Sequence, residues 1–211
     1  MSIVTPRCIL SVFLLVVVSW GVAAQGGGIA PQDASAFIDE FGHRAIVRLT
    51  APSLSDEELV GRFRELFDEG FDVPYIARSA LGRFWPLATD RERADYVPLF
   101  EDYISWVYAL QFRHYSGETF RVDRARPESE EIMTVESTVA RPDGPMTKID
   151  WSVASIGGKM KIRDVKIEGV SMIISHRDEF ANAIQQHGGR MAGLIEALGD
   201  KLVELRAPQS R

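Results

Sequence analysis

The segment from Lys159 to Phe180, KMKIRDVKIEGVSMIISHRDEF, constrains the fold more than any other part of the chain. Apolar residues first alternate with charged ones, at Met160 and Ile162, as in a half-buried strand. The phase then slips by one residue, because the next apolar residues are Val165 and Ile167. A slip of one residue indicates a β-bulge, which bends the strand that contains it. The segment therefore predicts a bent strand in a curved sheet.

The second half of this segment predicts how the sheet ends. The strand is expected to bend again at Gly169 and to continue through an apolar run at Val170 and residues 172–174. Ser175 is expected to cap a helix, with Asp178 three residues later in a capping-box position. A bent last strand that leads into a closing helix is typical of a sheet that curls around something.

The first half of the chain has helical periodicity. Capping boxes, in which Ser or Thr is followed three residues later by Glu, occur at Ser55–Glu58 and Thr89–Glu92. Helices are predicted over residues 33–49, from 55 onward, from 71 to Gly82, and from 89 to 115. Pro98 lies inside the longest of them and lacks a backbone donor, so a kink or break is expected near residues 94–96.

Alternation with a period of two follows the helices. Strands are predicted at 119–124, 132–141 and 147–153 and in the bent segment, with tight turns at Asp143-Gly144 and Gly157-Gly158. Two helices, at 175–187 and 190–205, close the chain. This order predicts an α+β fold, in which a curved, four-stranded antiparallel meander packs against helices. Helices against a curled sheet would form a cone.

Two blocks of the sequence resemble the MlaC (toluene-tolerance) family. The first block consists of Phe71-Asp72, Ile76-Ala77-Arg78, Leu81-Gly82, Trp85, Ala88-Thr89, Arg93, Phe100 and Tyr108. The second consists of Lys161-Ile162, Asp164-Val165, Ile167, Gly169-Val170-Ser171, Arg177 and Phe180. The chain departs from the family at Met160, where Trp is usual, and at Glu92, where Gln is usual. The resemblance extends roughly from Asp33 to Leu205.

The resemblance implies a periplasmic lipid-binding protein with a deep apolar cavity in a cone-shaped fold similar to the nuclear-transport-factor-2 type. Such proteins hold phospholipid acyl chains and shuttle lipid between two membranes, with no cofactor and no catalysis. The implied partners are an inner-membrane ABC transporter complex with a lipid-binding ring protein, and an outer-membrane lipoprotein–porin complex. A hopanoid or another lipid is an alternative ligand, since some relatives belong to the hopanoid pathway. An adaptor with a filled core is a further alternative.

The predicted lipid site combines the bent strand, its neighbouring strands and the long helix. Its residues are Trp85, Phe100, Ile104, Tyr108, Val135, Ile149, Trp151, Val165, Ile167 and Val170. Periodicity alone does not distinguish a lined pocket from a filled core, and the resemblance favours the pocket.

The N-terminus has the pattern of a secretory signal peptide. Basic Arg7 precedes an apolar stretch at residues 9–18, and Val22-Ala23-Ala24 supplies small residues before a cleavage point. An apolar run of about ten residues is too short to span a bilayer. Cleavage after Ala24 would leave a flexible leader (25–32), a single lipid-binding domain (33–206) and a tail (207–211). The only cysteine, Cys8, lies in the signal peptide, so a mature protein without disulfides is expected.

Charge and motifs disfavour several other classes of protein. The net charge is −6, and it becomes −7 once Arg7 is removed, which argues against binding nucleic acid. The four histidines, at positions 43, 114, 176 and 187, lack the spacing of a metal site, so no metal is expected. Neither a phosphate-binding GxxxxGK[ST] motif nor a GxSxG nucleophile motif is present.

Asp164 is the one residue that supports an enzymatic alternative. A carboxylate at the bend of a curled sheet can act as a general base, as in a cone-fold isomerase or hydratase. The structural alternative, which we favour, is a carboxylate that accepts hydrogen bonds from bulge amides or pairs with Arg163 or Arg78.

Overall fold

The computed structural model describes residues 28–142 and 144–207. The predicted signal peptide, Asp143 of the predicted turn and the last four residues of the predicted tail lie outside the described residues. The chain begins with helices α1 (Pro31–Leu49), α2 (Asp56–Gly70), α3 (Val73–Leu81) and α4 (Asp90–Ala109), and with the 3₁₀ helices η1 (Gly82–Leu87) and η2 (Leu110–His114). Strands β1 (Thr119–Pro127), β2 (Ile132–Ala140), β3 (Met146–Ile156), β4 (Lys159–Ile167) and β5 (Val170–Ser171) follow, and then α5 (Met172–Gln186) and α6 (Met191–Arg206).

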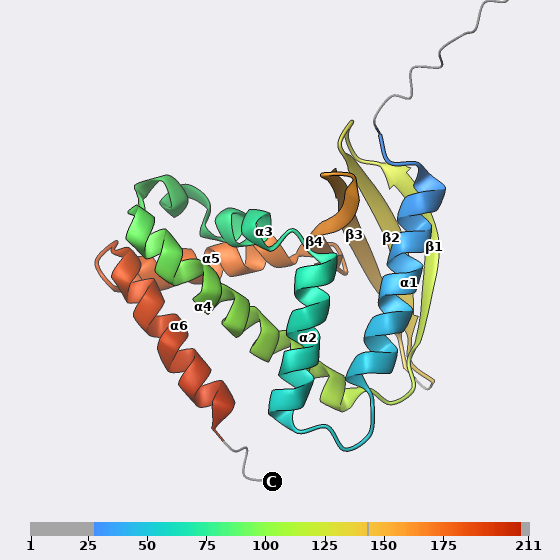
Figure 1. Cartoon of the computed structure of the whole chain (residues 1–211), viewed down its shortest axis with the longest axis horizontal. Helices are drawn as coiled ribbons and strands as arrows, with labels where there is room; N and C mark the ends of the chain where they lie inside the picture. Colours follow the sequence, from blue (N-terminus) through green and yellow to red (C-terminus); the bar gives the residue numbers. More distant parts are fainter. Residues whose placement is uncertain (1–27, 143, 208–211) are drawn as a thin grey trace, which may run out of the picture.

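The predicted α+β class and antiparallel meander are confirmed. The strands pair in chain order, β1-β2-β3-β4-β5, and each neighbouring pair is antiparallel. The sheet is open and contains a fifth strand of two residues that was not predicted. Helix α1 lies along one face of the sheet, and α4, α5 and α6 gather farther from it on the same side (Figure 1).

The bulge predicted between Ile162 and Val165 is confirmed. Ser152 of β3 pairs with Asp164 of β4, whereas the next residue, Val153, pairs with Ile162. Arg163 is therefore the additional residue of β4. The backbone amide of Asp72 donates to the carbonyl of Ile162 at 2.9 Å, which joins the start of α3 to the strand at the bulge.

The predicted second bend at Gly169 is wrong, because the chain reverses there. Glu168 and Gly169 both have positive φ, 50° and 80°, as the two central residues of a tight hairpin turn require. Strand β5 then runs back along β4, and Ser171 caps α5 by accepting a hydrogen bond from the Ile174 amide at 3.2 Å. The apolar run at residues 172–174 is thus the first turn of a helix, whose N-cap lies four residues before the predicted cap, Ser175.

Two glycine-to-alanine substitutions are expected to change stability in opposite directions. Gly169→Ala should lower the free energy of unfolding by about 1–2 kcal/mol, since a side chain is strained at positive φ. Gly61→Ala should raise it by about 0.5–1 kcal/mol, because Gly61 lies inside helix α2 with open space around an added Cβ. Urea unfolding of both variants measures the difference. Equal effects would contradict the turn.

The long helix ends earlier than predicted, because 3₁₀ geometry replaces the α-helix after Ala109. Helix α4 is continuous from Asp90 to Ala109, so of the kink or break predicted near residues 94–96 the break is absent. The capping boxes at Ser55–Glu58 and Thr89–Glu92 are confirmed, with both reciprocal hydrogen bonds present in each. The sequence therefore located the starts of these helices better than the end of α4.

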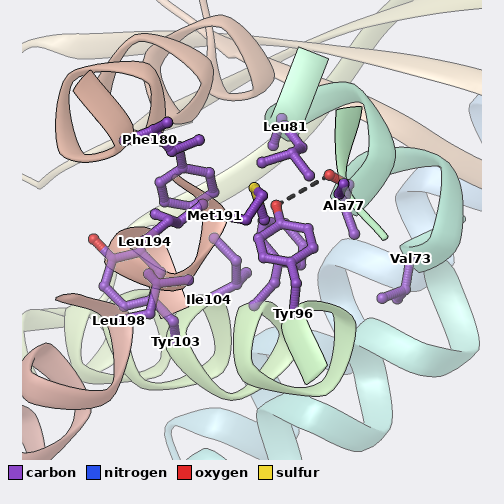
Figure 2. Close-up of a cluster of buried hydrophobic side chains, with 14 of the residues drawn as sticks. Val73, Ala77, Leu81, Tyr96, Tyr103, Ile104, Phe180, Met191, Leu194 and Leu198 are labelled. Atoms are coloured by element: carbon purple, nitrogen blue, oxygen red, sulfur yellow. Dashed lines mark hydrogen bonds between the residues drawn. The ribbon is translucent and has the colours of Figure 1, made fainter. Parts of the chain in front are cut away.

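The buried residues form two clusters. The first, which we call the helical core, is built mainly from α3, α4, α5 and α6, and Figure 2 shows Tyr96 within it, where its hydroxyl donates to the Ala77 carbonyl at 3.0 Å. The second, which we call the sheet core, joins α1 and α2 to buried positions of β2, β3 and β4, including Val135, Val153 and Ile162. Within the described residues, no helix is long and apolar enough to cross a bilayer.

Candidate functional site

A pocket of about 800 Å³ lies where the helical core and the sheet core meet. The helical core contributes Phe100 and Ile104 of α4 to its wall, and the sheet core contributes Phe41 of α1 and Leu66 of α2. The concave side of β3 and β4 and the first turns of α5 complete the wall. The pocket is thus bounded by both cores and belongs to neither alone.

Most of the lining side chains are apolar, and many are aromatic. Phe41 packs edge-on against Phe71 and Trp151, with ring centroids 5.7 and 6.4 Å apart, and Trp151 contacts Phe120 in the same way at 6.3 Å. Aromatic pairs in this geometry stabilise each other beyond their buried area, so this part of the wall is held in place by its own contacts. A preformed apolar pocket of this size suits an apolar ligand.

The structure brings seven of the ten predicted site residues to this pocket. They are Phe100, Ile104, Tyr108, Ile149, Trp151, Val165 and Ile167. Strand register accounts for four of them, because Ile149 pairs with Ile167 and Trp151 pairs with Val165 across β3 and β4. These four side chains therefore lie side by side on the face of the sheet that the pocket uses.

The other three predicted residues do not line the pocket. Val135 lies on β2 beside Trp151 but is fully buried in the sheet core, because α1 packs on that strand. Trp85 lies in η1 against the helical core, where the Arg93 guanidinium sits 5.4 Å from its ring centroid. Val170 is 59% exposed, because the chain reverses just before it.

The first two helices form a wall of the pocket that was not among the predicted site residues. The residues concerned are Phe41, Gly42, Ala45, Ile46, Leu49, Phe63, Leu66 and Phe67. A Cβ at Gly42 would lie 2.4 Å from Cε1 of Phe120, so this glycine allows α1 to approach β1 closely. The apolar stripe of α1 was visible in the sequence, but nothing in it indicated that part of the stripe faces open space.

Polar side chains line the pocket in several places, including Arg163 and Asp164 of β4. Gln111 and His114 are exposed, and near them Glu118 forms an ion pair with Arg141 at 3.3 Å. A separate pair, Tyr108 and His176, belongs to the wall between α4 and α5, with 2.8 Å between the Tyr108 hydroxyl and His176 Nε2. A polar edge and an apolar interior match the two ends of an amphiphilic ligand.

Asp164 is bonded within the protein as the structural alternative requires. Its carboxylate accepts hydrogen bonds from the Val165 amide at 2.9 Å, the Ser171 hydroxyl at 2.6 Å and the Ile173 amide at 3.3 Å. Arg163 instead pairs with Asp72 at 3.0 Å. The Asp164 carboxylate thus ties the bulge of β4 to the start of α5. Within residues 28–142 and 144–207, no group of three potential ligands converges on a metal position.

Asp164→Asn is expected to lower the free energy of unfolding by about 1–3 kcal/mol. An amide has one carbonyl oxygen where the carboxylate uses both oxygens, so at least one of these hydrogen bonds weakens. Thermal or urea unfolding measures the change, and lipid content is measured on the folded fraction, where it should be unchanged. If the variant has wild-type stability but has lost a catalytic activity that the wild type shows, the structural role is contradicted and catalysis by Asp164 is favoured.

The fold and the pocket define an α+β protein that can hold an apolar ligand between its helices and an antiparallel sheet. A family model described as MlaC protein matches residues 39–200, and the chain belongs to this family. The resemblance noted in the sequence is thereby confirmed.

Two comparisons with individual proteins add to the family match. A toluene tolerance protein, ttg2D, from Pseudomonas putida is 22% identical over 119 residues, which are 56% of this chain and 55% of the relative, so the chain spans about half of its length. A solved structure of the phospholipid-binding protein from Ralstonia solanacearum, in complex with a phospholipid, superposes with a TM-score of 0.68 at 22% identity. The match covers 82% of this chain and 98% of that one, and it shows a shared fold.

Proposed function

We propose that this protein is a periplasmic carrier that binds the acyl chains of a phospholipid in the pocket between its two cores. The observation that carries the proposal is the apolar lining of the 800 Å³ pocket. Membership of the MlaC family supports it, as does the phospholipid bound by the Ralstonia solanacearum protein of the same fold. The seven lining residues predicted from the sequence would contact the chains.

The energetics of a carrier explain why an apolar pocket suffices. Burying an acyl chain contributes about 0.8 kcal/mol per CH₂, so two chains of ordinary length contribute roughly 20 kcal/mol or more. A bilayer offers similar stabilisation, and a carrier that matches it can both take up and release lipid. Catalytic groups are not needed for such an exchange.

The headgroup would remain at the polar edge of the pocket. Burying an unpaired charged or polar headgroup is unfavourable by several kcal/mol, so it should stay in water. The exposed His114 and Arg141 lie among the lining residues and can face it there. This arrangement favours recognition of chains over recognition of headgroups.

The route of the lipid follows from the proposed location. The signal-peptide pattern before Gln25 would deliver the protein to the periplasm, where a carrier can travel between the two membranes. We place an inner-membrane ABC transporter complex with a ring protein at one end of the route and an outer-membrane lipoprotein–porin complex at the other. Energy and direction would come from the ATPase partner.

Native mass spectrometry tests the proposal. The chain is expressed with its leader, purified from the periplasmic fraction without detergent and sprayed intact. An N-terminus at Gln25 and an added mass equal to one phospholipid are expected. A triterpenoid mass would instead identify a hopanoid carrier. A protein that contains no lipid and takes up none from phospholipid vesicles would overturn the proposal and leave the adaptor with a filled core.

A further inference from the structure

A polar pair in the wall of the pocket joins α4 to α5. His176 of α5 is only 8% exposed, and its Nε2 lies 2.8 Å from the Tyr108 hydroxyl of α4. Both residues line the pocket. A polar group in such a wall is unfavourable unless its hydrogen bonds are satisfied, so the partners of this pair determine what it can offer a ligand.

The pair continues away from the pocket through Glu179. His176 Nδ1 lies 3.1 Å from one carboxylate oxygen of Glu179, and the Tyr103 hydroxyl donates to the other at 2.8 Å. The hydrogen bond from His176 holds the pKa of the Glu179 carboxyl below its ordinary value, so the carboxylate is ionised at neutral pH. An ionised carboxylate only accepts hydrogen bonds. Nδ1 therefore carries the proton that lies between these two residues.

This proton determines the direction of the remaining hydrogen bond. In the neutral imidazole, protonated Nδ1 leaves Nε2 as an acceptor, and Nε2 receives the proton of the Tyr108 hydroxyl. Burial raises the pKa of Tyr108, so the phenol keeps its proton. The thioether of Met172, 3.7 Å from the same hydroxyl, is the weaker acceptor. The hydroxyl proton of Tyr108 is thus already hydrogen-bonded to His176, and only the lone pairs of the hydroxyl oxygen remain for a ligand.

We propose that the Tyr108 hydroxyl, oriented by His176 and Glu179, is a polar anchor within the pocket that accepts a hydrogen bond from a hydroxyl group on the buried part of the lipid. Tyr108 is the contacting residue, and His176 and Glu179 position it. The ligand class favoured by this anchor is a lipid whose apolar portion carries a hydroxyl. The inference rests on the proposed function, because it requires a lipid in this pocket.

Competition between matched phospholipids tests the anchor. The probes are a phosphatidylcholine with palmitoyl and stearoyl chains, its analogues with one hydroxyl at a series of positions along the stearoyl chain, and the corresponding oxo analogues. Mixtures are offered to delipidated protein at mildly alkaline pH. The bound fraction is read by native mass spectrometry. At one or a few positions the hydroxyl analogue should bind about two- to tenfold better than the parent, as one neutral hydrogen bond allows.

Three variants separate the anchor from its surroundings. Tyr108→Phe keeps the ring and should abolish the preference for the hydroxyl. Tyr103→Phe is the matched control, since it removes a hydroxyl bonded to the same carboxylate from a residue of the same helix that does not line the pocket. It should leave the preference within about twofold. His176→Phe keeps the stacking on Phe180 but frees the Tyr108 proton, so the oxo analogue should now bind better than the parent.

The outcomes distinguish the anchor from the carrier function. The anchor is overturned if the wild type binds the parent lipid with no preference for the hydroxyl analogues, or if the preference survives in Tyr108→Phe. Either result leaves the carrier function intact. A wild-type preference for the oxo analogue overturns the assigned direction of the hydrogen bond. Failure of the parent lipid to bind overturns the carrier, and the anchor with it.

Discussion

Replacing Val165 by tryptophan is expected to abolish lipid loading while the empty protein stays folded. Val165 is half-buried and faces the pocket from β4, so an indole there occupies space that the acyl chains would use. Steric competition of this kind does not compress the surrounding core, and we expect the delipidated variant to unfold within about 1 kcal/mol of the wild type. Lipid content by native mass spectrometry and urea unfolding of delipidated protein measure the two effects separately.

Val135→Trp is the matched control for this prediction. Val135 and Val165 flank Trp151 on neighbouring strands, but Val135 is fully buried under α1 and does not line the pocket. Extra bulk there overpacks a filled core and should lower the free energy of unfolding by about 1–3 kcal/mol or more, with lipid retained in the folded fraction. If Val165→Trp loads lipid at the wild-type level, the acyl chains do not occupy this part of the pocket.

Phe180→Ala is expected to give the largest loss of stability among single truncations of the helical core. Phe180 is 1% exposed and lies edge-on to Tyr96 and Phe100, with ring centroids 6.2 and 6.1 Å away. Removing the ring leaves a cavity among three helices and should lower the free energy of unfolding by about 3–5 kcal/mol. Thermal and urea unfolding of delipidated protein measure the loss.

Phe84→Ala is the control for Phe180→Ala. Phe84 lies in η1, is only partly buried against the helical core and has the Arg83 guanidinium 5.0 Å from its ring centroid. Its truncation removes less buried apolar surface and leaves no enclosed cavity, so it should lower the free energy of unfolding by less than half as much as Phe180→Ala. Comparable losses in the two variants would mean that the helical core is not centred on Phe180.

The parts of the fold that the sequence predicted are those set by local chemistry. The capping boxes located the starts of α2 and α4, and the phase slip after Ile162 located the bulge. The alternation at Ile149 and Trp151 predicted that both side chains lie on one face of their strand, which is the face that the pocket uses. Each of these features depends on residues within a few positions of one another.

The errors arise where the path of the chain depends on distant contacts or on backbone geometry. Glu168 adopts positive φ although it is not a glycine, so the sequence, with a single glycine at position 169, predicts a bend and not a two-residue turn. Because a bent strand would continue through Val170, this residue was wrongly included in the predicted site. Val135 was assigned to the pocket because strand alternation specifies a face of the sheet, and it does not reveal which part of that face α1 covers.

The location of the pocket between two cores has a consequence for how the protein melts. Its walls are shared, so a bound acyl chain would contact both cores and would be released only when one of them loosens. A ligand that binds only the folded state adds about 2.7 kcal/mol at a hundredfold excess over its dissociation constant. Here that stabilisation would act on both cores at once, because α2 and α4 contribute buried residues to each of them. Without lipid, the protein should therefore still unfold in a single transition, but at a lower temperature.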